Sequence, residues 1–185
     1  MNTKEKVMLH KGMDRVKRME FEEALEVFDR LLAVNSQIPE AWNNKGVALF
    51  RLGRPEEALE CYKKTLAIDP DNMDALRNTG FVLRCQGKME EALQAYDTVL
   101  QKGGDAIDFE ATAGVLISLG RLEEAMNCLF LAKDMMSLDR FEEEIGILKG
   151  MILEKNMEKN NTAPEPGPGG ENGSNGLNPN SEGKE

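Results

Sequence analysis

The feature that most constrains this chain is a pattern that returns after 34 residues. In the stretch "AWNNKGVALFRLGRPEEALECYKKTLAIDP", residues 41–70, small and aromatic residues stand at fixed intervals. Its key members Gly46, Gly53, Ala58 and Tyr62 reappear later as Gly80, Gly87, Ala92 and Tyr96. The same spacing points backwards to Gly12, Ala24 and Phe28 and forwards to Gly114, and Ala125 follows Ala92 after 33 residues. A chain that repeats itself at such a period builds its fold from stacked copies of one unit.

We divide the repeating part into four copies, at about 5–38, 39–72, 73–106 and 107–138. The last unit arrives one residue early, which we interpret as a deletion in the turn or helix end of the fourth copy, with Gly114 in the place of Gly80. Each copy has two apolar-periodic segments separated by a break with Gly and charge, such as "RLGRPEE". Pro55 suits the first turn of a helix, and the two glutamates that follow it interact favourably with the dipole of that helix. Each copy is therefore predicted to be helix, tight turn, helix.

Composition agrees with a helical fold and excludes several classes of function. Good helix formers dominate, and aromatic residues make up only 5% of the 185 residues. The formal charge of −10 opposes binding to phosphate backbones, so no nucleic-acid role is expected. No apolar run approaches the roughly 18 residues that cross a membrane, and the charged N-terminal stretch lacks an apolar signal core. We expect a cytoplasmic protein whose three cysteines, Cys61, Cys85 and Cys128, are reduced buried thiols.

The repeat resembles the tetratricopeptide repeat (TPR) family. The second copy matches best, with Trp42, Gly46, Ala58, Tyr62 and Pro70 at the family's spacing, and the resemblance covers residues 5 to about 138. It implies an all-α, right-handed solenoid of four helix-turn-helix hairpins. The small residues mark close helix crossings, and the large ring fills the gap towards the next repeat.

The rest of the chain has two parts. From Asp139 to residue 156, apolar residues at helical spacing predict one more helix, which we interpret as the terminal cap of the solenoid. A partner-binding helix is the alternative. Residues 157–185 are rich in Pro, Gly and Asn and have almost nothing to bury, so we expect a disordered tail. The solenoid domain is therefore predicted to span residues 1–156.

No catalytic constellation is visible, with one histidine in the chain and no phosphate-binding or nucleophile motif, so we expect neither an enzyme nor a cofactor or metal. The resemblance instead implies recognition on the concave surface lined by the first helix of each pair. The residues expected to bind an extended peptide there are Asn44, Asn78, Arg51, Arg77 and Lys17.

Each of these residues has a plainer alternative. The asparagines, 34 residues apart, are expected to bond a peptide backbone, or else to tie neighbouring helices together. The cations are expected to read carboxylates on the ligand, or else to be ordinary solvated charges. Phe50 and Phe81 serve either as apolar anchors or as packing between repeats.

The predicted function is a protein–protein interaction adaptor. The alternatives are a self-associating structural module, with "FLAKDMM" and the terminal helix as its contact, and a non-catalytic accessory subunit of an enzyme complex. Some family members hold acidic chaperone tails in a carboxylate clamp of Lys and Asn side chains. At the clamp positions this chain has Leu9, Met13, Glu40 and Asp74, so no such binding is expected.

Overall fold

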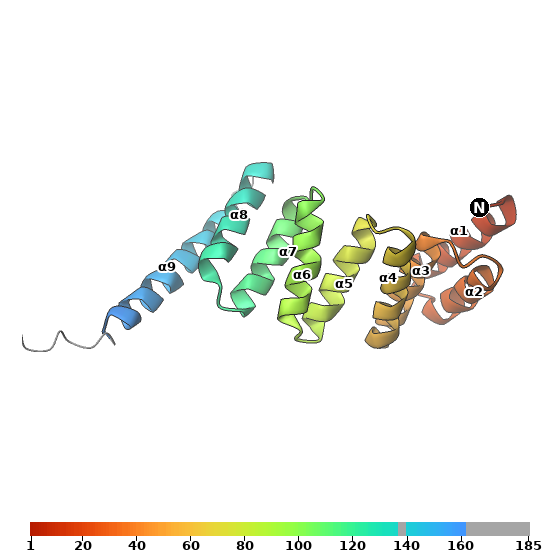
Figure 1. Cartoon of the computed structure of the whole chain (residues 1–185), viewed down its shortest axis with the longest axis horizontal. Helices are drawn as coiled ribbons and strands as arrows, with labels where there is room; N and C mark the ends of the chain where they lie inside the picture. Colours follow the sequence, from red (N-terminus) through yellow and green to blue (C-terminus); the bar gives the residue numbers. More distant parts are fainter. Residues whose placement is uncertain (137–139, 162–185) are drawn as a thin grey trace, which may run out of the picture.

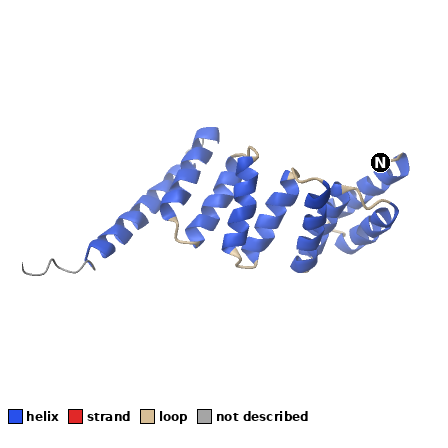
Figure 2. Ribbon diagram, viewed as in Figure 1, coloured by secondary structure: helices blue, strands red, loops and turns tan. Residues whose placement is uncertain are grey.

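The computed structural model describes residues 1–136 and 140–161, and within them it contains helices and no strand. The helices are α1 (Thr3–Lys17), α2 (Phe21–Val34), α3 (Pro39–Arg51), α4 (Pro55–Ile68), α5 (Met73–Cys85), α6 (Met89–Gln101), α7 (Ala106–Ser118), α8 (Leu122–Met136) and α9 (Arg140–Asn161). They stand side by side in chain order from α1 to α9 (Figure 1), and short loops join consecutive helices from α1 to α8 (Figure 2). The predicted all-α solenoid of four hairpins and a terminal helix is confirmed.

Each of the first three hairpins closes by placing an aromatic ring on a glycine. A methyl group built on Gly46 of α3 would lie 2.5 Å from Cε1 of Tyr62 in α4, so only glycine fits beneath that ring. The same contact joins Gly12 to Phe28 and Gly80 to Tyr96. The three rings are buried, and this close crossing explains why the sequence repeats a glycine and a large residue 16 positions apart.

The turn inside each hairpin needs a left-handed backbone. Gly53, Gly87 and Gly120 have φ of +74°, +76° and +70°, a conformation that costs other residues about 1–2 kcal/mol. In the first hairpin the corresponding residue is Met19, with φ of +61°. The first turn therefore has the geometry of the others without their glycine.

The irregularity of the fourth copy lies before its first helix, and not in the turn or helix end of that copy as predicted. Helices α3, α5 and α7 begin at 39, 73 and 106, so the lost residue falls between α5 and α7. Helix α6 is shorter by this one residue, with 13 residues where α4 has 14. Gly103, with φ of +92°, lies in the loop between α6 and α7. The residue facing the second helix of the fourth pair is therefore Ala113, which is buried, and not Gly114.

Three further findings differ from the sequence expectations or limit them. Helix α9 runs to Asn161 instead of ending at 156, and residues 162–185 lie outside the described part. Of the three free cysteines only Cys61 is fully buried, whereas Cys85 is exposed because it shares the outward register of Arg51. Within the described residues, no helix has both the length and the apolarity to cross a membrane.

Candidate functional site

The candidate site is the side of the solenoid formed by the first helices of the pairs. These helices contact one another directly, α1 with α3 and α3 with α5. We call this surface the A-face. Its residues recur at one register of α3, α5 and α7, and they are Asn44, Val47, Phe50, Arg51, Arg77, Asn78, Phe81, Arg84, Cys85, Ile107, Glu110, Ala111, Gly114, Ile117 and Ser118.

An aromatic pair bridges two repeats on the A-face. The rings of Phe50 and Phe81 meet edge to face, with centroids 5.6 Å apart and planes at 78°. Phe81 remains 41% exposed, although it is a large apolar residue. The guanidinium of Arg84 lies 5.5 Å from the centroid of the Phe81 ring, within the range of a cation–π contact. The centre of the A-face thus presents an exposed ring held in place by a neighbour on each side.

Arg84 separates this pair from a pocket of about 450 Å³. The pocket floor is apolar, from Ile107, Ala111 and Ile117, and Glu110 and Glu144 line it as well. Nε of Arg84 is buried and has no hydrogen-bond partner, and its side chain forms no ion pair within residues 1–136 and 140–161. A buried guanidinium N–H without a partner is costly, and the Arg84 guanidinium also lines the pocket, where a bound carboxylate would pair with its charge.

The two predicted asparagines lie on the A-face, but their amide nitrogens are already used. Asn44 Nδ2 donates to the carbonyl of Glu40 at 2.8 Å, within its own helix. Asn78 Nδ2 donates to Oδ1 of Asn43 at 3.1 Å and so joins α5 to α3. Asn78 therefore ties neighbouring helices together, and each of the two predicted asparagines retains its Oδ1 as an acceptor.

Arg77 is engaged by the next repeat. Its Nε and Nη2 bond both carboxylate oxygens of Asp108 at 2.8 and 2.7 Å, and Nη2 lies 3.3 Å from Asp105. Burial alone would raise the pKa of Asp108, whose side chain is 4% exposed, but the bonds from Arg77 and from the Asp105 backbone hold that pKa below its ordinary value. Asp108 is thus a buried anchor for α7 and does not lie in the open groove, where the register based on Gly114 would have placed it.

The remaining predicted cations are at the helix ends. Arg51 is the last residue of α3 and is exposed, and it forms no ion pair with a described residue. Lys17 is the last residue of α1, with a side chain 74% exposed and Nζ 3.9 Å from Asp14. The structure therefore does not bring the five predicted residues into one cluster.

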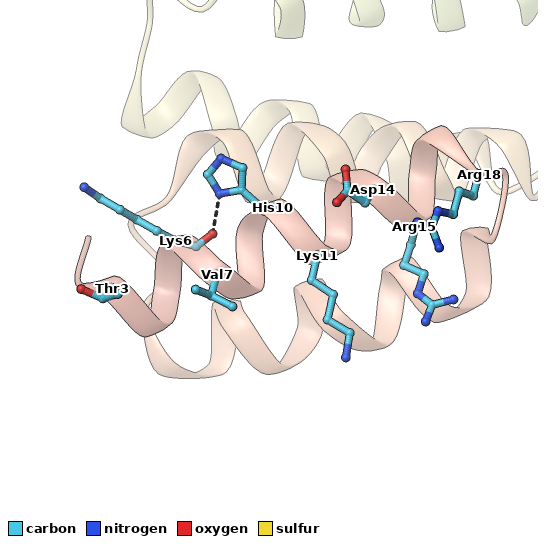
Figure 3. Close-up of a pocket in the computed structure, with 8 residues that line it drawn as sticks. All are labelled: Thr3, Lys6, Val7, His10, Lys11, Asp14, Arg15 and Arg18. Atoms are coloured by element: carbon cyan, nitrogen blue, oxygen red, sulfur yellow. Dashed lines mark hydrogen bonds between the residues drawn. The ribbon is translucent and has the colours of Figure 1, made fainter.

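A second hollow, of about 550 Å³, lies along α1 (Figure 3). All its lining residues come from α1 and its cap, and they are Thr3, Lys6, Val7, His10, Lys11, Asp14, Arg15 and Arg18. His10 Nδ1 donates to the carbonyl of Lys6 at 2.7 Å, and Arg15 is paired with Glu20. A hollow lined by one helix has no opposing wall, so we do not place the site here.

Sequence reasoning left the role of Phe81 open, did not single out Arg84 as a binding residue, and missed Ile107 and Ile117. A repeat pattern gives the register of Phe81 but not its exposure. The pocket residues of α7 were missed because the fourth repeat was aligned one residue out of register. The spacing of the turn glycines Gly53, Gly87 and Gly120, which is 34 and then 33 residues, gives the correct alignment.

Comparison with known proteins supports the assignment of the repeat. Two family models described as tetratricopeptide repeat match residues 39–72 and 61–94. No curated protein matches the chain in sequence.

Several solved structures share the fold. MamA (41-end) from Desulfovibrio magneticus RS-1 is 22% identical, with 86% of this chain and 90% of that chain covered and a TM-score of 0.73. Pseudomonas aeruginosa PilF is 22% identical over 83% of this chain and 69% of that chain, with a TM-score of 0.68. The first TPR of Spaghetti (RPAP3), solved with the HSP90 peptide SRMEEVD, is 21% identical over 65% and 96%, with a TM-score of 0.62. Similarity at this identity concerns the fold. The two matched models place tetratricopeptide repeats within residues 39–94, and the Gly46–Tyr62 contact lies inside the first of the two matches.

Proposed function

We propose that this chain is a non-catalytic protein-interaction module that binds an extended peptide segment on the A-face. The observation that carries the proposal is Arg84, whose buried Nε has no partner and stands between an exposed ring and an apolar pocket. Pockets of this kind, mostly apolar with a few fixed polar groups, are typical of binding sites.

The chemistry of the surroundings defines the ligand. The guanidinium of Arg84 suits a carboxylate, and Phe81 with the pocket floor suits an apolar side chain next to it. Oδ1 of Asn44 and of Asn78 accepts no hydrogen bond within the described residues, and we propose that these oxygens accept N–H groups of the bound backbone. We expect the bound segment to carry an acidic residue adjacent to an aliphatic or aromatic one.

Arg77, Arg51 and Lys17 take different parts in this proposal. Arg77 holds α7 through Asp108, so its contribution to the ligand is to keep the pocket wall in place. Arg51 and Lys17 lie at the open ends of α3 and α1, where they would steer an acidic segment rather than fix it.

A displayed library of random peptides tests the proposal, with the full chain as bait. We expect the enriched sequences to share an acidic residue beside an apolar one. Arg84→Gln should weaken the best of them at least about 10-fold, the loss expected for one charge-assisted bond of about 1.4 kcal/mol or more. Arg30→Gln is the matched control. Arg30 is an exposed residue of α2, away from the A-face, so this change should leave the affinity unchanged. Equal binding by wild type and Arg84→Gln would refute the site.

The peptide SRMEEVD belongs in the same experiment. It was solved on the Spaghetti (RPAP3) domain, and this chain has Leu9, Met13, Glu40 and Asp74 at the clamp positions. We propose that the ligand is not of this type, so SRMEEVD should bind no better than a scrambled version of itself.

A further inference from the structure

Helix α9 repeats the register of α7 on the side that faces α8. The residues 33 positions after Asp108, Thr112 and Val115 are Phe141, Ile145 and Leu148, and all six are buried. The last three join the same hydrophobic cluster as Leu129 of α8. Helix α9 is therefore placed as the first helix of a fifth pair.

No described residue covers the opposite side of α9 at Gly146. The position of Gly12, Gly46, Gly80 and Ala113 is taken by Gly146, which has the small size that a ring from the second helix requires. A methyl group built on Gly146 would meet no atom of another described segment within 4 Å. In the earlier pairs that space holds Phe28, Tyr62 or Tyr96. We call this open space at Gly146 the hole; no aromatic ring of a described residue fills it.

The described residues contain no second helix for this pair. Leu153 stands where Gly53, Gly87 and Gly120 make their turns, so α9 continues through this point to Asn161. Residues 162–185 contain no Phe, Tyr or Trp that could take the place of Tyr62.

A suitable ring is exposed beside the hole. Phe130 of α8 is 41% exposed, at a register where the earlier repeats have Asp29, Lys63 and Asp97. Nζ of Lys149, one turn after Gly146, lies 5.5 Å from the centroid of the Phe130 ring, which places ring and hole on one face. Leu153 and Met157 of α9 are exposed nearby in sequence. The last described hairpin thus has an exposed apolar residue, Phe130, at the position where the earlier hairpins have a charged one.

We infer that a second copy of this chain covers this end. When a protruding ring and a hole lie side by side on one face, a two-fold axis between them brings each ring onto the hole of the other copy. In this dimer Phe130 of each chain packs on Gly146 of the other, as Tyr62 packs on Gly46 within the second pair. The dimer contact uses Phe130 and Gly146, neither of which lines the proposed peptide pocket, although Leu129 and Glu144 of the same two helices do.

Light scattering coupled to size-exclusion chromatography of the full chain tests this inference. We expect a mass of twice 20.6 kDa for the wild type at tens of micromolar. Phe130→Asp restores the residue type of Asp29 and Asp97, and a Cβ atom at Gly146 meets no described atom within 4 Å, so we expect Phe130→Asp and Gly146→Leu both to fold. Each should weaken the dimer at least 10-fold and give a mass of 20.6 kDa at the same concentration.

Phe81→Asp is the matched control, because it makes the same change at a ring that is also 41% exposed but lies on the A-face. It should remain dimeric and lose peptide binding, whereas Phe130→Asp should do the reverse. A wild type that is monomeric at all concentrations would overturn the inference. So would a dimer that survives both substitutions, or a mass that keeps rising with concentration, which would indicate head-to-tail stacking.

Discussion

Helices α3 and α9 have a glycine at the same register position, but the two glycines differ in what packs against them. Gly46 of α3 lies under the ring of Tyr62, whereas Gly146 of α9 faces open space. The side chains behind both glycines are buried against the preceding helix, Ala41 and Ala48 in α3 and Phe141 and Leu148 in α9. The helices themselves are alike, and the two regions differ in the part of the chain that comes after the glycine.

The residue seven positions after each glycine decides the difference. Gly53 adopts a φ of +74° and turns the chain back, so that α4 covers α3. Leu153 continues the helix to Asn161, so no described segment returns to cover α9. A single left-handed position therefore determines whether a helix becomes half of a closed pair or an open end.

The largest expected contrast is between the two rings. Tyr62→Ala should lower the free energy of unfolding by about 3–5 kcal/mol, because it empties the buried space above Gly46. Phe130→Ala should cost well under about 1 kcal/mol in the monomer, because exposed substitutions have little effect. Urea denaturation at a concentration below that of dimer formation measures both. Equal losses would contradict the picture of α8 and α9 as an open end.

The next contrast concerns the inner faces of α7 and α9, which are anchored differently. Phe141 occupies in α9 the place of Asp108 in α7, whose carboxylate depends on Arg77. Arg77→Met should cost about 2–3 kcal/mol at pH 7, somewhat less than for a fully buried pair because Arg77 is partly exposed.

This loss has a defined pH dependence. Because the folded pKa of Asp108 is depressed, its contribution is fully present above the unfolded pKa of about 3.9 and disappears as pH falls through the folded value. The difference between wild type and Arg77→Met should therefore shrink below about pH 4. Denaturation curves in urea from pH 7 to about pH 2.5 would show it. A difference that stays constant over this range would mean that Asp108 is not the partner that matters.

The glycines themselves should respond with opposite signs. Gly46→Ala should destabilise by about 1–3 kcal/mol, because the new methyl group overlaps Tyr62. Gly146→Ala should stabilise by about 0.5–1 kcal/mol, because alanine favours the helix and meets nothing. Urea unfolding of both variants, at a concentration below that of dimer formation, checks the signs, and a loss at Gly146 would show that its surface is covered within the monomer.

The smallest effect is expected at the first turn. Met19→Gly should stabilise the chain by about 0.5–1 kcal/mol, because Met19 holds the left-handed conformation that glycine adopts at 53, 87 and 120. Its side chain is exposed, so little packing is lost. Gly53→Ala is the opposite change at the matching turn and should destabilise. If Met19→Gly had no effect or destabilised, the turn glycines would matter less than their φ values indicate.

The fold could be predicted from the sequence because the repeated residues are those that contact each other within one hairpin. Gly46 and Tyr62 touch within one hairpin, and the period carries that contact from copy to copy. The end of α9 could not be predicted in the same way, since residues 157–161 differ from a loop only in weak propensities.

The candidate site was less predictable, because it depends on contacts between repeats. Arg77 looked like a free groove cation, and its partner Asp108 lies 31 residues away at a buried position that the misplaced register hid. The missing partner of Arg84 Nε is likewise a property of three-dimensional packing. The pattern located the A-face, and the structure was needed to distinguish binding residues from residues that hold the repeats together.

The most direct test of the central claim, that the A-face binds the ligand, is a ¹⁵N NMR titration of the full chain with the best library peptide. The largest shifts should fall on backbone amides of α5 and α7 around Phe81, Arg84 and Gly114, and Arg84→Gln should remove them while Phe130→Asp leaves them in place. Shifts confined to α1 or to α8 and α9 would contradict the claim and assign peptide binding to an end of the solenoid.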